Sequence, residues 1–96
     1  MHYNRKELRM SAHGRHRAKN RAFRPQVIRA ILDFGDHYFA GEGSTAVFVG
    51  RREVACARKR GMRLDHLANR AVILGPNDVV VTVVHIYRLP RHWRRA

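Results

Sequence analysis

A histidine and two arginines recur at every fourth position near the start of the chain. They are His13, Arg17 and Arg21, which we call the basic stripe. In a helix, positions i, i+4 and i+8 share one face and span about 12 Å at about 1.5 Å per residue. Such a face offers one titratable imidazole and two permanent cations to adjacent phosphates. The spacing predicts a phosphate-binding face with a general acid or base at one end; the alternative is an ordinary solvated basic helix.

A second group of polar and aromatic side chains lies near the end of the chain. His85 ends its most apolar run, and Arg88, Arg91 and Trp93 follow. Alternation along a strand places Val83 and His85 on one face. Rings that stack on bases and arginines that contact phosphates are the usual components of single-stranded RNA recognition. We therefore expect nucleic-acid contacts here; the alternatives are a histidine bonded to the backbone and a disordered solubilising tail.

Together these groups could cleave RNA without a metal ion. The ribose 2′-hydroxyl attacks its own phosphate when one group takes a proton, another gives one, and cations stabilise the phosphorane. His13 and His85 are the candidates for proton transfer, with no separate assignment of acid and base. Arg17, Arg21 and Arg88 are the candidate phosphate binders. This hypothesis requires that the two imidazoles meet in one groove.

Three further features bear on the chemistry. Arg51 and Arg52 are expected at the start of a helix, where free amides and the helix dipole favour an anion, so they predict a second phosphate site unless they are simple surface charge. Cys56 falls on an apolar helical face and is expected to be a small core residue. The acidic residues lack ligand-like spacing apart from Asp33 and Asp36. We therefore predict no metal site and no cofactor.

Composition points to a polyanionic partner. The 96 residues include 20 Lys plus Arg against 7 Asp plus Glu, a formal charge of +13. Such a field attracts nucleic acid, with counterion release at each phosphate contact, and we favour RNA over DNA. A single cysteine excludes an intramolecular disulfide and indicates a reducing compartment. No apolar run is long enough for a membrane span, so we predict a soluble, cytoplasmic protein with no membrane partner.

The chain is short enough for one domain with a modest core. We predict an α+β domain over residues 11–89, with a basic N-terminal arm over 1–10 and a basic C-terminal tail over 90–96. Its expected elements are helices over 11–20, 25–34 and 51–60 and strands over 36–40, 44–50, 71–74 and 79–87. The helical pair should pack on an antiparallel sheet of about four strands, with the further helix between two hairpins. The run 79–84 is expected to be a central strand buried on both faces.

The whole pattern resembles an uncharacterised family of small bacterial proteins with the motif His-x-x-x-Arg-x-x-x-Arg. The matching positions are His13, Arg17, Arg21, Phe23, Gly35, 47–52 and 81–85. The chain departs from that family at Ala22 and Phe23, where glycine and isoleucine are usual. The family in turn resembles the barnase, EndoU, colicin and RelE-type ribonucleases and toxins. This resemblance implies an α+β fold, toxin-type ribonuclease activity and an acidic protein partner such as an antitoxin.

The sequence thus favours a small RNA-acting protein, with a metal-independent endoribonuclease of toxin type as the leading hypothesis. One rival is a non-catalytic nucleic-acid-binding module of ribosome-associated, phage or regulatory type, for which the histidines are incidental. Another is an inhibitor that binds an acidic protein partner. Loss of RNA cleavage in His13→Ala would favour the first hypothesis, and a steep salt dependence of binding alone the second.

Overall fold

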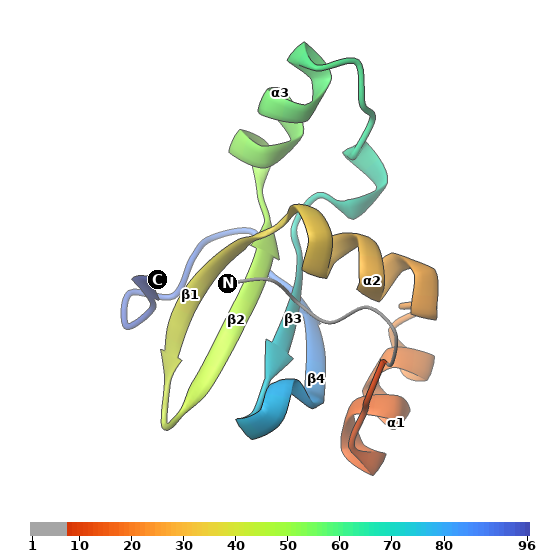
Figure 1. The fold of residues 1–96 in the computed structure, drawn as a ribbon, viewed down its shortest axis with the longest axis vertical. Coiled ribbons are helices and arrows are strands. Elements are labelled where there is room, and N and C mark those ends of the chain that lie inside the picture. The colour runs from red at the N-terminus through yellow and green to blue at the C-terminus, as the bar shows by residue number, and fades with distance from the viewer. Residues whose placement is uncertain (1–7) are drawn as a thin grey trace.

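The computed structural model describes residues 8–96, so most of the predicted N-terminal arm lies outside the described residues. This part of the chain forms α1 (Ala12–Asn20), α2 (Pro25–Phe34), β1 (Asp36–Gly41), β2 (Ser44–Val49), α3 (Arg51–Lys59), β3 (Arg70–Leu74), β4 (Val80–His85) and β5 (Arg94–Arg95). Short 3-10 turns occupy Asp65–Leu67 and Pro76–Asp78. The strands form one antiparallel sheet in the order β4-β3-β2-β1-β5 (Figure 1). The predicted α+β class is confirmed.

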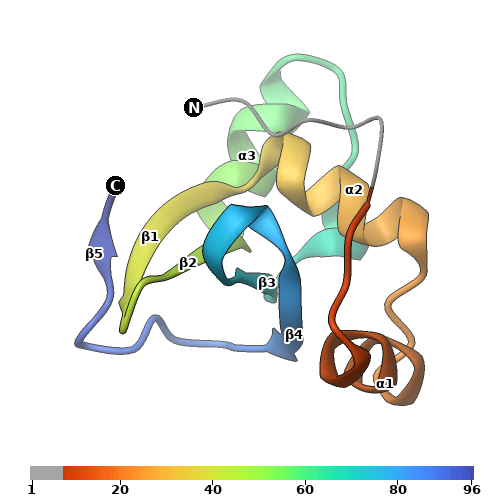
Figure 2. The same ribbon diagram turned by 60° about the horizontal axis from the view of Figure 1, so that its bottom comes forward.

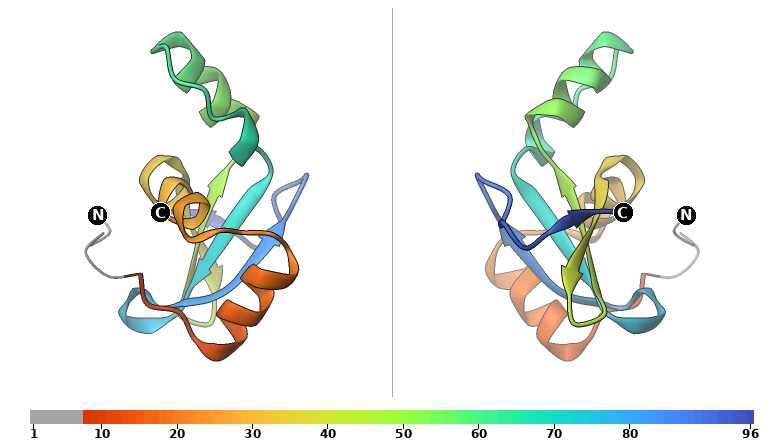
Figure 3. Two further views of the ribbon diagram at one scale, coloured as in Figure 1. Left: turned by 90° about the vertical axis from the view of Figure 1, so that its right-hand side faces the viewer. Right: turned by 90° about the vertical axis from the view of Figure 1, so that its left-hand side faces the viewer.

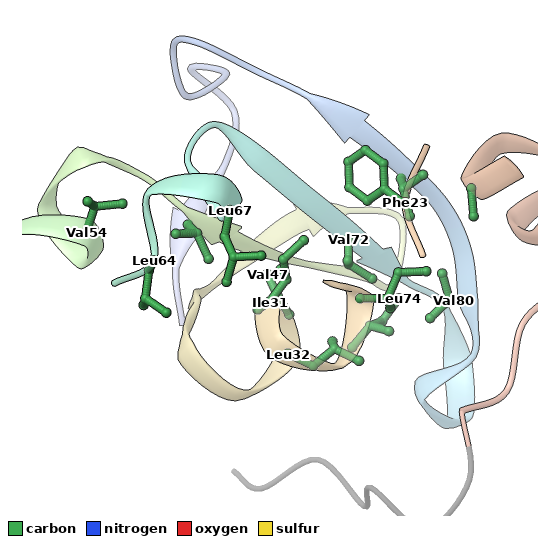
Figure 4. Packing of buried hydrophobic residues seen from close by; sticks show 14 of the residues in the cluster. Phe23, Ile31, Leu32, Val47, Val54, Leu64, Leu67, Val72, Leu74 and Val80 are labelled. Carbon is green, nitrogen blue, oxygen red and sulfur yellow. The ribbon is translucent and has the colours of Figure 1, made fainter. Parts of the chain in front are cut away.

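α2 covers one face of this sheet, and α1 lies along its β4 edge. In Figure 3, α2 packs across β2 and β3. Pro25 starts α2 at a position where its missing amide costs nothing. The apolar stripe of α2 is fully buried at Ile28 and Ile31. In Figure 4, Ile31 and Leu32 face the core beside Val47 of the sheet. This core fixes the helical pair on the sheet.

The opposite face is covered by the chain that follows β4. It crosses beneath the sheet and adds β5 to the free edge of β1 (Figure 2). A second apolar cluster there contains Tyr38 and Phe48, and Trp93 packs on Tyr38 with ring centroids 6.0 Å apart. Arg95 pairs with Asp36. Residues 94–95, predicted to be tail, therefore form a strand, and the sheet has five strands and not about four.

β4 lies at the edge of the sheet, which corrects its predicted central position. Its partner in the sheet is β3, and a bulge at Ile73/Leu74 interrupts the pairing. The strand buried on both faces is β2, in which residues 46–49 are all buried. The valine run is still half covered because α1 lies against it and Met10 pairs with Val80. An apolar run in a sequence predicts that a strand is buried, but it does not identify the neighbouring element. Here α1 buries β4 at the side where another strand would lie in a central position.

α3 projects from one end of the sheet (Figure 1). Val54 and Ala57 anchor it to the main core through Leu64 and Leu67. Cys56 is exposed, which corrects the prediction of a core residue. Cys56 falls beside buried residues in sequence but on the outer side of the helix. No helix among residues 8–96 is long and apolar enough to cross a membrane.

Candidate nucleic-acid interface

α1 is seated on β4 by contacts at each of its ends. The hydroxyl of Ser11 accepts a hydrogen bond from the Gly14 amide at 2.9 Å and caps the helix. The Ser11 amide in turn donates to the Val80 carbonyl at 2.9 Å. At the other end, the guanidinium of Arg21 donates to the Val83 carbonyl at 2.7 Å. The helix therefore runs beside β4 in the same direction.

The basic stripe occupies one flank of α1. The residues that α1 buries are Gly14 and Ala18, and at about 100° per residue the stripe lies to one side of the line that joins them. Arg17 is half-buried, and its Nε donates to Nε2 of His13 at 3.4 Å, a long and weak contact. Arg21, the last member, reaches the edge of β4. The stripe is helical as predicted, and it leads from solvent to the end of the sheet.

His85 sits where the stripe ends. Its direct partner across β3 and β4 is Arg70. The ring of Phe23 meets the imidazole edge-on, with centroids 5.0 Å apart, and the Arg70 guanidinium lies 4.9 Å from the Phe23 centroid. Partial burial lowers the pKa of His85 from its usual 6.5, and the positive charges of Arg70 and Arg21 lower it further. The imidazole is therefore mainly neutral at pH 7 and able to accept a proton.

A hollow of about 610 Å³ opens beside His85, and we call it the tryptophan hollow. Arg21 and His85 line one side of it, and His92 and Trp93 line it from the C-terminal segment. The remaining wall is apolar and consists of Ile73, Val84, Ile86 and Pro90. This volume lies within the usual range of small-molecule pockets, about 300–1,000 Å³. An aromatic ring, an apolar wall, one arginine and two histidines thus border this hollow.

His13 and His85 do not meet as predicted. The helical turn that carries His13 lies against Val80 at the start of β4, whereas His85 is the last residue of that strand. From His13 to Arg21 alone, the helix rises about 12 Å. One phosphate cannot contact both imidazoles across that distance. His92 lines the same hollow as His85, but from the hairpin end of β1, where it lies beside Gly41.

The other predicted residues of the C-terminal region have different placements. Trp93 is half-buried between Tyr38 and the tryptophan hollow, and its amide donates to the Pro90 carbonyl at 3.1 Å. Arg91 is exposed in the same turn, with its carbonyl accepting from Arg94 at 3.0 Å. Arg88 is exposed just beyond the end of β4. The segment is therefore ordered around Trp93, and Arg88 and Arg91 lie on the solvent side of it.

The predicted phosphate site at Arg51 and Arg52 is at the start of α3, but this helix start has its own carboxylate. The Gly50 amide donates to Glu53 at 2.7 Å. Burial raises the pKa of Glu53, and the adjacent Asp36 carboxyl raises it further, while the bond from Gly50 lowers it. Both carboxyls line a hollow of about 250 Å³ together with Arg52. Negative charge at this helix start disfavours a phosphate there, so we leave Arg51 and Arg52 out of the interface.

Sequence reasoning missed two residues of this site, His92 and Arg70. His92 had been part of a presumed tail, and its place depends on the path of the chain beneath the sheet. Arg70 becomes important only through its register opposite His85. The sequence spacing of His92 and Arg70 does not predict their positions in the site, because each lies on a segment that only the folded chain brings there.

Among residues 8–96, no three His, Cys, Asp or Glu side chains gather in a way that could hold a metal ion. No protein-family model, curated protein or solved structure matches this chain. The family resemblance of the basic stripe, and the toxin role that it implies, therefore remain predictions. The geometry of the site is what can support a function.

Proposed function

We propose that this protein binds single-stranded nucleic acid, with RNA preferred, across the basic stripe and the tryptophan hollow. Phosphates lie along Arg17 and Arg21, and one unstacked base enters the hollow beside Trp93. The observation that carries this proposal is the continuity of the two surfaces, because Arg21 belongs to both. The net charge of +13 also attracts nucleic acid over a long range, because nucleic acid is a polyanion.

The shape of the hollow favours a single strand over a duplex. Its apolar wall and aromatic ring suit the face of a base, and stacking on an aromatic side chain contributes about 1–3 kcal/mol per base. A duplex keeps its bases stacked inside and could present only its backbone. The exposed imidazole of His85 borders the hollow and can bond a ribose hydroxyl, which supports RNA over DNA.

Intrinsic fluorescence tests the proposal directly, because Trp93 is the single tryptophan of the chain. A short mixed-sequence RNA should change the Trp93 emission, and DNA of the same sequence should bind more weakly. Arg17→Gln and His92→Ala should each weaken binding about five- to tenfold, the loss of one contact. Arg63→Gln, at an exposed arginine beyond α3, is the charge-matched control for Arg17→Gln. Equal affinity of these two arginine variants would contradict the proposed interface.

A second candidate function is cleavage of the bound RNA, and the neutral imidazole of His85 near the charges of Arg21 and Arg70 favours it. Neutral His85 would take the proton of the 2′-hydroxyl, whose oxygen then bonds to phosphorus. The bond from phosphorus to the 5′-oxygen breaks, that oxygen takes a proton from water, and His85 returns its proton to the solvent. The products are a 2′,3′-cyclic phosphate and a 5′-hydroxyl. Arg21 and Arg70 lie close enough to His85 to stabilise the negative phosphorane.

Cleavage is tested with RNA incubated with the protein in the presence of a chelator. His85→Ala should lower the rate about 10²- to 10⁴-fold, the usual contribution of general acid–base catalysis. His13→Ala is the matched control and should cleave almost normally, because His13 lies at the far end of α1. RNA that carries a 2′-deoxy position should resist cleavage there. Activity that requires a metal ion, or that survives His85→Ala, would exclude this mechanism and leave nucleic-acid binding as the proposed function.

A further inference from the structure

An apolar groove runs between α1 and α2, and we call it the helical groove. Its volume is about 340 Å³. Ala18, Phe23 and Ile28 form its floor, and Met10 and Pro25 form its apolar walls. Phe23 and Ile28 are buried at 3% and 0% exposure, so the floor is part of the rigid core. The groove is therefore a permanent feature of the packed domain.

The rim of the helical groove is cationic. Arg15 and Lys19 rise from α1, and Arg24 stands in the connection to α2. All three side chains belong to exposed residues, and no aspartate or glutamate lines this groove among the described residues. Arg15 and Lys19 lie on the flank of α1 opposite the basic stripe. Two differently built surfaces thus share one helix.

The chemistry of the groove selects against nucleic acid. Nucleobases need partners for their polar edges, and the apolar floor provides none, so a buried base would lose its bonds to water without replacement. The ring of Phe23 is already engaged by His85 and Arg70. Aliphatic side chains lose nothing on entering such a groove and gain about 25 cal/mol per Å² of apolar area buried. In a protein partner, carboxylates beside those aliphatic side chains would complement the charges of Arg15, Lys19 and Arg24.

We propose that the helical groove binds an acidic, apolar-bearing segment of a protein partner. One or two large aliphatic side chains of the partner fill the groove, and glutamates or aspartates beside them pair with Arg15, Lys19 and Arg24. The first seven residues of this chain carry two cations and one carboxylate, the wrong balance for this rim. The inference does not rest on nucleic-acid binding, because it uses the other flank of α1.

Methionine methyl groups provide a local readout. Met10 lines the helical groove, whereas Met62 lines the separate hollow beside α3. With ¹³C-methyl methionine, an acidic amphipathic peptide of glutamates and leucines should shift the Met10 signal and leave Met62 unchanged. The double variant R15E/K19E should bind this peptide at least about tenfold more weakly. R29E/R63E makes the same change of charge at exposed arginines outside all three hollows and should bind normally.

The substitution Arg24→Glu extends the test to a rim position outside any helix, so a weakened α1 cannot explain its effect. It should weaken the peptide about fivefold. A peptide with lysine in place of glutamate should not bind. The inference is overturned when millimolar acidic peptide leaves Met10 unmoved, or when both double variants bind equally. It is also overturned when RNA shifts Met10 and displaces the peptide, since the groove would then be a nucleic-acid surface.

Discussion

At the scale of single residues, His85 holds the centre of the candidate interface. The residue is exposed, but the Phe23 ring covers one edge of its imidazole, and the charges of Arg70 on β3 and Arg21 at the end of α1 act on it. Desolvation and like charge both oppose a second positive charge there. A bound phosphate would reverse the effect of the arginines, because its negative charge favours the imidazolium. The pKa of His85 should therefore depend both on the neighbouring arginines and on a bound phosphate.

We predict a His85 pKa below 6.5 in the free protein. Arg70→Gln should raise it, since a positive charge is removed, and Arg63→Gln should leave it unchanged because Arg63 is not among the groups that shift it. Saturating RNA should raise the His85 pKa in the unsubstituted protein. Titration of the imidazole protons by NMR measures all three values. A His85 pKa that does not change in Arg70→Gln would show that Arg70 does not contribute to the shift.

The residue assignments show what sequence could and could not predict about the site. Arg17 and Arg21 are identified by helical spacing, which depends only on local backbone geometry. Arg70 and His92 depend on strand register and on the path of the chain beneath the sheet. The pairing of His13 with His85 was inferred from chemistry alone, and the direction of α1 along β4 separates them.

At the scale of elements, the close approach of α1 to β4 depends on glycine. A Cβ atom at position 14 would lie 2.3 Å from the carbonyl oxygen of Val80, far inside any real contact. The backbone of β4 cannot yield easily, because the same Val80 carbonyl accepts the Ser11 amide. Glycine at position 14 thus lowers the helix propensity of α1 but allows the helix to contact β4.

Gly14→Ala should therefore destabilise the protein, although alanine favours an isolated helix by about 1 kcal/mol over glycine. We expect a net loss of about 2 kcal/mol from the overlap, which lowers Tm by roughly 4–8 °C per kcal/mol for a domain of this size. His16→Ala is the control, since His16 is exposed on the same helix. Thermal denaturation followed by circular dichroism measures both variants. A Gly14→Ala protein as stable as His16→Ala would show that α1 can move away from β4.

The elements themselves were predictable where local signals are strong. Pro25 and Gly35 mark the two ends of α2, and glycines mark the first hairpin, so the bounds of these elements agree closely with the sequence prediction. β5 was not predictable, because a strand of two residues has no periodicity and forms only through its long-range contacts with β1. The edge position of β4 was missed for a related reason. Hydrophobicity indicates that a strand is covered without indicating what covers it.

At the scale of the whole molecule, positive charge surrounds the domain, but the proposed contacts with phosphate are confined to one side. α3 and the residues after it carry exposed cations at the far end of the molecule from α1 (Figure 1). A net charge of +13 attracts any polyanion. Only cations in contact with phosphate release counterions on binding. The salt dependence of binding therefore distinguishes the interface from the general field.

We predict that the affinity for single-stranded RNA falls steeply with salt, with a slope that depends on particular arginines. Each phosphate contact contributes about 0.7 to the slope of log K against log salt for a single strand. Arg17→Gln should therefore reduce the slope by about 0.7, whereas Arg63→Gln should lower affinity slightly at low salt and leave the slope unchanged. Trp93 fluorescence titrations at several salt concentrations measure both variants. Equal slopes for the two would mean that the RNA is held by diffuse charge and not by the basic stripe.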